Sequence, residues 1–220
     1  MELVVFAGIP ASGKSTESLN YREKGYEIVS SDEIRGKIMK GVSLADVPPE
    51  EQNRINALVF ETVYKNTEDA LRRGVSVVVD ATHLNRGHRM TFLNYFSKFD
   101  CPKKCVLFIT PFELCMQRNS KRTGPALVPE KVMYRMLGFF ECPSYDEGWD
   151  VIEPIAANTP CSASLTAENI FASGTSAYDN CKAYLYLTEK CCPYTLSPED
   201  FRQVLTRAEK LCRHVSPDEL

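Results

Sequence analysis

The segment LVVFAGIPASGKST, residues 3–16, decides the fold. Its first five residues, Leu3–Ala7, form a continuous apolar run, which is typical of a parallel strand that is buried on both faces. The next eight, Gly8–Ser15, fit the pattern G-x-x-x-x-G-K-[ST] of a phosphate-binding loop. A helix is expected to follow from Lys14 to Lys24. Strand, glycine-rich turn and helix in this order predict a P-loop domain.

The residue types in this loop suit the binding of ATP with magnesium. Glycines allow the backbone to wrap around a phosphate, and the start of the helix adds a partial positive charge. Lys14 is expected to reach the β- and γ-phosphates, and Ser15 is expected to ligate Mg²⁺. The candidate nucleotide-binding residues of the loop are Gly8, Pro10, Ala11, Ser12, Gly13, Lys14, Ser15 and Thr16.

Downstream of the loop, apolar runs alternate with helical patterns. Strands are expected at Tyr26–Ser30, Val75–Asp80, Cys105–Thr110 and Trp149–Glu153. Helices are expected at about 31–40, with Ser31 and Asp32 as N-cap residues, and at Glu50–Arg73, Arg86–Lys98, Phe112–Lys121 and Val128–Cys142. This alternation predicts an α/β fold of the P-loop NTPase class, with a parallel sheet covered by helices on both faces. Ligands of such sheets bind at the carboxyl ends of the strands.

The composition changes near Ala156. Residues 156–177 are small and polar, which is typical of a linker, and two helices are expected at Tyr178–Cys191 and Ser197–His214. We therefore expect a P-loop kinase domain over residues 1–155 and a linker with a helical C-terminal arm over 156–220. The last helix is mildly basic, carrying Arg202, Arg207, Lys210 and Arg213 against Glu199, Asp200 and Glu209. The arm could serve the acceptor or an assembly contact, such as a homo-oligomer, or it could cover an edge of the sheet.

Charge and cysteine content limit the possible partners and the cellular compartment. With 26 basic and 29 acidic side chains the net charge is −3, so a nucleic acid could be held only by a local basic patch. The nine scattered cysteines form neither a disulfide framework nor a complete zinc pattern. No apolar run reaches the ~18 residues that a membrane span needs. We expect a cytoplasmic protein with reduced thiols and no membrane partner.

Two acidic residues follow predicted strands. Asp32 could accept a proton from an attacking hydroxyl, or it could simply cap the helix that begins there. Arg35, three residues later, would share a helical face with Asp32, and the two could equally be a surface ion pair. Asp80 ends the run VVVD, where a carboxylate could hold the Mg²⁺ shell or cap the next turn.

A basic run, RNSKR at 118–122, precedes Thr123-Gly124-Pro125. Such a run before Gly-Pro suits a mobile lid over the phosphates, because arginine makes bidentate contacts with phosphoryl oxygens. Arg118 and Arg122 are therefore further candidates for ATP binding. The alternative is an ordinary solvated face.

Together these segments resemble the kinase domain of the 5′-polynucleotide kinase family, which includes bacteriophage polynucleotide kinase and phosphorylates 5′-hydroxyl ends of DNA or RNA. The resemblance covers roughly residues 1–145. It is carried by GIPASGKST (8–16), SSDEIR (30–35), VVDATHLNRGHR (78–89) and RNSKR (118–122). No D-x-D-x-T signature of an additional phosphatase is found in residues 156–220.

The resemblance implies a role for each matching residue. Asp32 would be the general base, Arg35 the clamp on the phosphate next to the attacking hydroxyl, and Asp80 the matching acid at the metal. Arg122 would bind ATP, so the implied catalytic set is Lys14, Asp32, Arg35 and Arg122. The implied activity is ATP-dependent phosphorylation of a nucleic-acid 5′-hydroxyl end. A kinase of a small metabolite or an RNA-linked group, and a nucleotide-dependent binding switch, share the same loop and remain alternatives.

Overall fold

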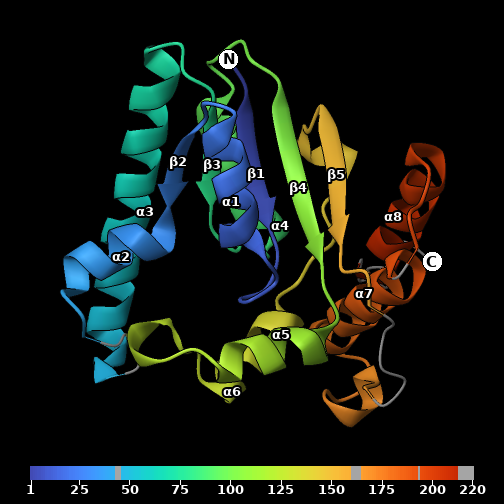
Figure 1. Cartoon of the computed structure of the whole chain (residues 1–220). Helices are drawn as coiled ribbons and strands as arrows, with labels where there is room; N and C mark the ends of the chain where they lie inside the picture. The colour runs from blue at the N-terminus through green and yellow to red at the C-terminus, as the bar shows by residue number, and fades with distance from the viewer. Residues whose placement is uncertain (43–45, 160–164, 193, 213–220) are drawn as a thin grey trace.

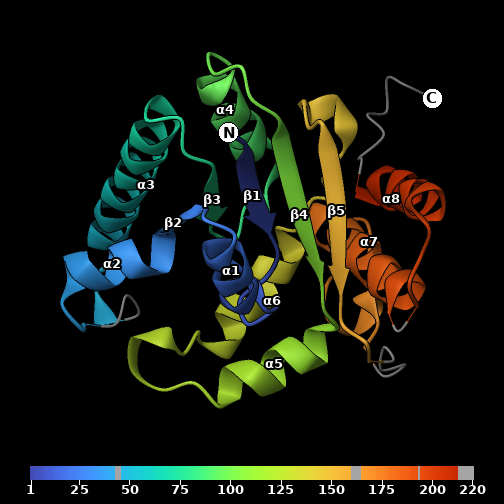
Figure 2. The same ribbon diagram turned by 45° about the horizontal axis from the view of Figure 1, so that its top comes forward.

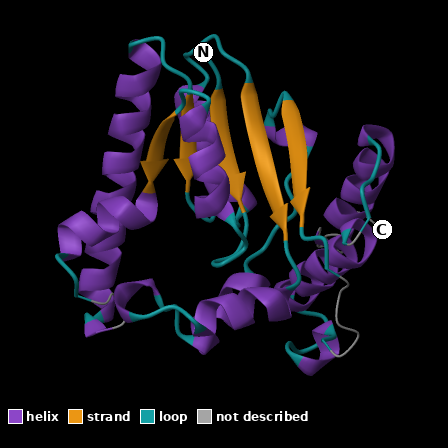
Figure 3. Ribbon diagram, in the orientation of Figure 1, coloured by secondary structure: helices purple, strands orange, loops and turns teal. Residues whose placement is uncertain are grey.

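The computed structural model describes residues 1–42, 46–159, 165–192 and 194–212, and its centre is a five-stranded parallel sheet (Figures 1 and 3). The strand order is β2-β3-β1-β4-β5. The strands are β1 (Leu3–Ala7), β2 (Glu27–Ser30), β3 (Val77–Asp80), β4 (Lys103–Ile109) and β5 (Val151–Ala156). The apolar run of β1 is central, where every one of its side chains is buried.

All strands point the same way, so their carboxyl ends share one edge of the sheet (Figure 1). Val5 of β1 is in register with Val79 of β3 and with Cys105 of β4. This register brings the residues that follow β1, β2, β3 and β4 to the same edge. The parallel α/β fold predicted from the sequence is confirmed.

Eight α-helices lie within the described residues. They are α1 (Lys14–Glu23), α2 (Ser31–Met39), α3 (Pro49–Arg72), α4 (Arg86–Phe96), α5 (Phe112–Ser120), α6 (Glu130–Gly138), α7 (Ser176–Cys191) and α8 (Pro198–Cys212). None of the described helices has both the length and the apolar character needed to cross a membrane.

Helices cover both faces of the sheet, but unequally (Figure 2). On one face, α1 contributes Tyr21 to a small cluster with Val4, Phe6 and Phe108. The other face carries the main core, which receives side chains from α3, α4, α6, α7 and α8. The helix pair at the C-terminus is therefore part of the main core.

The arm predicted from the sequence packs against the sheet domain. Tyr184 and Leu187 of α7 and Phe201 and Leu205 of α8 are buried in the same cluster as the central strands. This is the sheet-covering alternative that the sequence left open. The domain division at residue 155 stays a prediction. Cys161, Arg213 and His214, which entered the sequence predictions, lie outside the described residues.

Several local boundaries differ from those predicted, and three of them have a clear structural cause. The helix predicted to reach Cys142 ends at Gly138, whose carbonyl accepts from Asn180 Nδ2 at 2.9 Å. Strand β5 runs to Ala156, beyond the predicted Glu153, because it stays paired with β4 up to Ile109. Ser31 and Asp32 do not cap α2. Ser30 is the N-cap, since its side chain accepts from the backbone N–H of Glu33.

Candidate functional site

The phosphate-binding loop leaves β1 with a tightly constrained backbone. A Cβ atom on Gly8 would lie only 2.8 Å from Cβ of Phe108 and 2.9 Å from Oγ of Ser12, so only glycine fits there. The N–H of Gly8 donates to the carbonyl of Thr82 at 2.9 Å. Ala11 and Gly13 adopt left-handed conformations, with φ of 63° and 110°. Neighbouring strands thus impose the loop's shape.

Lys14 is the electrostatic centre of the site. Its side chain is only 8% exposed, and its ammonium donates to the carbonyls of Gly8 at 2.9 Å and Ile9 at 2.8 Å. Burial lowers the pKa of Lys14 to about 8, against the opposing charges of Asp80 and Asp32, while the positive charge of Arg122 lowers it further. These three charged groups, predicted from three separate motifs, therefore all act on the same ammonium.

Asp80, at the end of β3, lies beside the loop in a group of hydroxyls. Ser18 donates to its Oδ2 at 3.0 Å, and Ser31 donates to its backbone carbonyl at 3.3 Å. Burial raises the pKa of Asp80, while the charge of Lys14 and hydrogen bonds from Ser18 and Ser15 work in the other direction. One buried carboxylate with a neighbouring serine hydroxyl is therefore available at the phosphate loop.

This donor set fits magnesium bound together with a nucleotide. Among the described residues no group of three or more His, Cys, Asp or Glu side chains could hold a metal by itself. Mg²⁺ usually takes one or two carboxylates and completes its shell with water and substrate phosphates. Ser15 and Asp80 are the residues that would hold it here.

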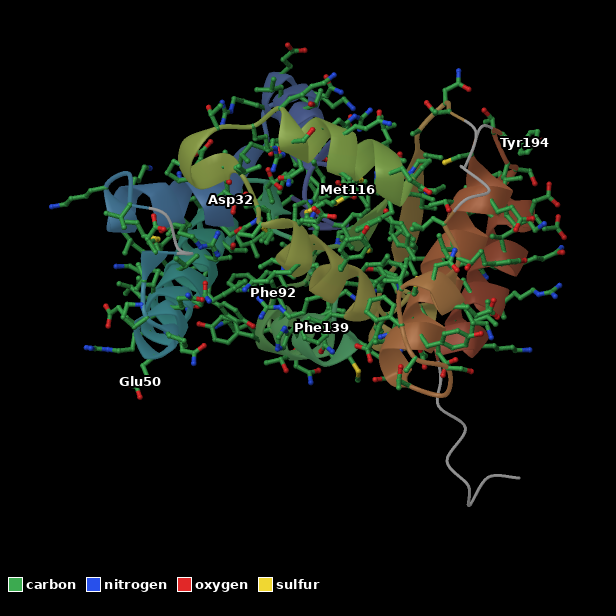
Figure 4. All side chains as sticks on the ribbon, turned by 90° about the horizontal axis from the view of Figure 1, so that it is seen from below. Asp32, Glu50, Phe92, Met116, Phe139 and Tyr194 are labelled. Carbon is green, nitrogen blue, oxygen red and sulfur yellow. The ribbon has the colours of Figure 1, made fainter. Side chains whose placement is uncertain are left out.

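Asp32 and Arg35 form a pair at the start of α2. Arg35 Nη1 donates to Asp32 Oδ1 at 2.7 Å, and Nη2 donates to Asn56 Oδ1 of α3 at 3.4 Å. The Asp32 side chain is 84% exposed, and Figure 4 shows it beside the segment that follows α5. The structure thus contains the ion pair between Arg35 and Asp32 that the sequence offered as an alternative. The other alternative, that Asp32 caps α2, is wrong because Ser30 is the N-cap. Arg35 Nε is buried without a hydrogen-bond partner among the described residues.

The basic run at 118–122 is divided between a helix and a turn. Arg118 belongs to the last turn of α5, so a lid can begin only after Ser120. Arg122 follows the helix, and its Nη1 is 3.5 Å from the carbonyl of Ala126. Two hydrogen bonds between Asn119 and the backbone of Val128, at 2.7 and 3.1 Å, close the intervening loop. The loop extends below the strand ends toward α2 (Figures 1 and 2).

Sequence reasoning missed several polar residues that shape the site. Ser18 lies one helical turn after Lys14 and Ser15, so the helix period could have found it. The hydroxyl of Thr110 donates to the carbonyl of Ser12 at 2.9 Å. The two residues are 98 positions apart, so no local sequence pattern predicts this contact. His83, which follows β3, is a further buried polar residue of this region. Its Nδ1 lies 3.1 Å from the carbonyl of Phe6, and burial lowers its pKa to about 4.

The chain matches a known protein family and resembles several curated proteins at low identity. A family model described as AAA domain (AAA_33) matches residues 3–143. A bifunctional polynucleotide phosphatase/kinase of Schizosaccharomyces pombe is 25% identical over 158 residues, covering 70% of this chain and 33% of the relative. An L-seryl-tRNA(Sec) kinase of Methanococcus maripaludis is 23% identical over 149 residues, covering 68% of this chain and 56% of the relative. The chain thus matches only a third to about half of these relatives' length.

The fold also occurs in a solved structure. A putative kinase from Chloroflexus aurantiacus superposes with a TM-score of 0.57 at 15% identity, covering 70% of this chain and 84% of that one. At this identity the likeness concerns the fold alone.

Proposed function

Because this chain belongs to the AAA domain family (AAA_33), matched over residues 3–143, we propose that it is an ATP-dependent kinase of 5′-hydroxyl ends of DNA or RNA. The observation that carries the proposal is the buried P-loop lysine at one edge of the sheet, within electrostatic range of Asp80, Asp32 and Arg122. The Asp32–Arg35 pair favours transfer to a hydroxyl acceptor. It places an exposed carboxylate and a guanidinium together where that acceptor would enter.

The proposed transfer uses these residues in separate roles. Phosphates of ATP bind the loop, and Lys14 exchanges its two carbonyl contacts for phosphate oxygens. The acceptor oxygen forms a bond to the γ-phosphorus, the bond from that phosphorus to the β-γ bridging oxygen breaks, and ADP leaves. Asp32 takes the hydroxyl proton. Arg122, with Arg118 as a helper, neutralises charge on the transferring phosphoryl group.

Magnesium, held by Ser15 and Asp80, would neutralise charge on the β- and γ-phosphate oxygens. The residues of the chain would then account for positioning, proton removal and the remaining charge.

The acceptor is proposed to be a nucleic acid because two basic features suit its backbone. Arg35 places a partly exposed guanidinium beside Asp32, where it would contact a phosphate next to the attacking hydroxyl. Farther away, α8 exposes Arg202, Arg207 and Lys210, and none of the three forms an ion pair within the described part of the chain. The guanidinium groups of Arg202 and Arg207 lie over the rings of Tyr145 and Tyr186, at 4.5 and 5.5 Å from the ring centroids, which holds both charges in place on this face.

The second candidate is a kinase of a small metabolite or an RNA-linked group. The similarity to a protein named L-seryl-tRNA(Sec) kinase favours it, and it would use the same loop, base and arginines. A nucleotide-dependent switch is the weaker alternative, since an exposed base-like carboxylate beside an arginine serves transfer to a hydroxyl better than positioning of water.

One assay separates these candidates. The protein is incubated with γ-labelled ATP and a panel of 5′-hydroxyl oligonucleotides of DNA and RNA, nucleosides, sugars and aminoacylated RNA. We expect label on the oligonucleotide 5′ ends. Label only on a sugar or an aminoacyl group would replace the proposal with the second candidate, and release of free phosphate with every acceptor would favour the switch.

A further inference from the structure

The phosphate-binding loop is held by a residue outside the region that matches the family. Tyr184 lies in α7, beyond residue 143, where the family match ends. Its ring is 1% exposed, and its hydroxyl donates to the carbonyl of Thr110 at 2.6 Å. The side chain of Thr110 in turn donates to the carbonyl of Ser12 at 2.9 Å. Two buried hydrogen bonds thus lead from the C-terminal arm to the loop.

The second of these bonds fixes the direction of one loop amide. In a trans peptide the C=O and the following N–H point in opposite directions. Because the Ser12 carbonyl is drawn toward Thr110, the N–H of Gly13 points away from Thr110. That N–H has no acceptor in the described part of the chain. It is therefore available to a phosphate oxygen, as expected for a donor in the middle of the P-loop motif.

The loop needs such a hold because its backbone is strained. Ala11 is a non-glycine residue at φ 63°, and conformations of this kind persist only when the surroundings impose them. Gly8 fixes the start of the loop against Phe108, and the Thr110 hydroxyl fixes its far side. The carbonyl of Thr110 accepts from the Tyr184 hydroxyl at 2.6 Å and from the Cys115 thiol at 3.8 Å, and the Tyr184 bond is the shorter of the two. The Tyr184 ring is in turn anchored against Phe140 at a centroid distance of 4.9 Å.

We propose that Tyr184 is a positioning residue of the nucleotide site, which acts through Thr110 to orient the peptide between Ser12 and Gly13. The C-terminal arm then contributes to binding of nucleoside di- and triphosphates, a role beyond the acceptor, assembly and sheet-covering roles that the sequence left open. The inference rests on the nucleotide-binding part of the proposed function and is independent of the acceptor.

The first test compares Tyr184→Phe with Tyr178→Phe. Tyr178 is on the same helix, and its hydroxyl donates to Glu168 in an exposed contact at 3.2 Å, so it is a matched control. ADP binding is measured by titration calorimetry, and folding by thermal denaturation. We expect Tyr184→Phe to raise the dissociation constant for ADP about three- to tenfold, the range for one lost hydrogen bond, with no change in the control. A lower melting temperature with unchanged ADP affinity would mean that Tyr184 only stabilises the core, and it would overturn the proposal.

A second pair of variants tests the relay without changing α7. Thr110→Val removes the hydroxyl that reaches Ser12, whereas Thr110→Ser keeps it. We expect weaker ADP binding in the valine variant and near-normal binding in the serine variant, and equal binding by both would overturn the relay. In a double-mutant cycle, the effects of Tyr184→Phe and Thr110→Val should be less than additive, since both act on one peptide. Full additivity would contradict the relay. Tight ADP binding by the wild type without transfer to any acceptor would remove the proposed kinase activity and leave this inference intact.

Discussion

Acid should destabilise the protein in part through the buried histidine His83. The side chain is 8% exposed, lies 3.1 Å from the carbonyl of Phe6, and has a pKa lowered to about 4, chiefly by burial. Below pH 6.5 the unfolded chain binds a proton at this histidine that the folded protein does not bind until about pH 4. Stability should therefore fall as the pH falls through this window.

The size of the effect follows from the two pKa values. A shift from 6.5 to about 4 is about 2.5 units, and at about 1.4 kcal/mol per unit it corresponds to about 3 kcal/mol of unfolding free energy. A typical domain has only about 5–15 kcal/mol in total. The loss should be nearly absent at pH 7 and approach its full size near pH 4.

The assay is urea unfolding of wild type and His83→Asn at several pH values between 7 and 4. Asparagine tolerates the left-handed backbone at this position, where φ is 39°, and its amide can still donate to the Phe6 carbonyl. For each protein the unfolding free energy is plotted against pH. Other acid-sensitive groups are common to both proteins, so the difference between the two curves isolates the contribution of His83. His88→Asn changes an exposed histidine nearby and serves as the control. If the wild-type and His83→Asn curves run parallel down to pH 4, the reasoning is refuted.

The remaining predictions concern the proposed transfer. Lys14→Ala should abolish phosphoryl transfer while the circular dichroism spectrum stays native, and an active, folded variant would remove the P-loop interpretation. Asp32→Asn should lower kcat at least ~10²-fold with ADP affinity unchanged, whereas Asp100→Asn, on the surface, should behave as wild type; a loss of thermal stability alone would exclude Asp32 as the base. Arg122→Ala should raise the KM for ATP, and rescue by Arg122→Lys would show that charge suffices without a bidentate contact. Replacing both Arg207 and Lys210 of α8 with Glu should weaken binding of long oligonucleotides and flatten its salt dependence, and unchanged salt slopes would exclude this face.

The sequence predicted the parts of the fold that local patterns encode. Strand Leu3–Ala7 matches the prediction residue for residue, since a buried parallel strand is apolar throughout. The parallel sheet is confirmed, and the resemblance to the polynucleotide kinase family is confirmed by the family match and the named relatives. The predicted end of α6 was wrong, because the carbonyl of its last residue accepts from Asn180 of α7. This partner lies 42 residues away, so the local sequence around residue 138 does not reveal it.

For the candidate site, too, the sequence predicted the residues that belong to local motifs. Motifs identified Lys14, Asp80, Asp32 and Arg122, and the structure brings their charges together around the lysine. Their roles in catalysis stay predictions. The contacts of Tyr184, Thr110 and His83 could not be predicted, because each joins residues more than 70 positions apart through a single polar atom.

The central place of β1 has a consequence for the growing polypeptide. Its partners β3 and β4 are completed only at Asp80 and Ile109, so roughly 100 residues must be added before both of its edges are paired. Ribosomes add about 5–20 residues per second, which leaves this wholly apolar strand exposed for about 5–20 s. Chaperones that bind short hydrophobic segments would meet it during this interval. The yield of native protein should therefore depend on how fast the messenger RNA is translated between the codons for β3 and β4, even though the finished molecule is the same.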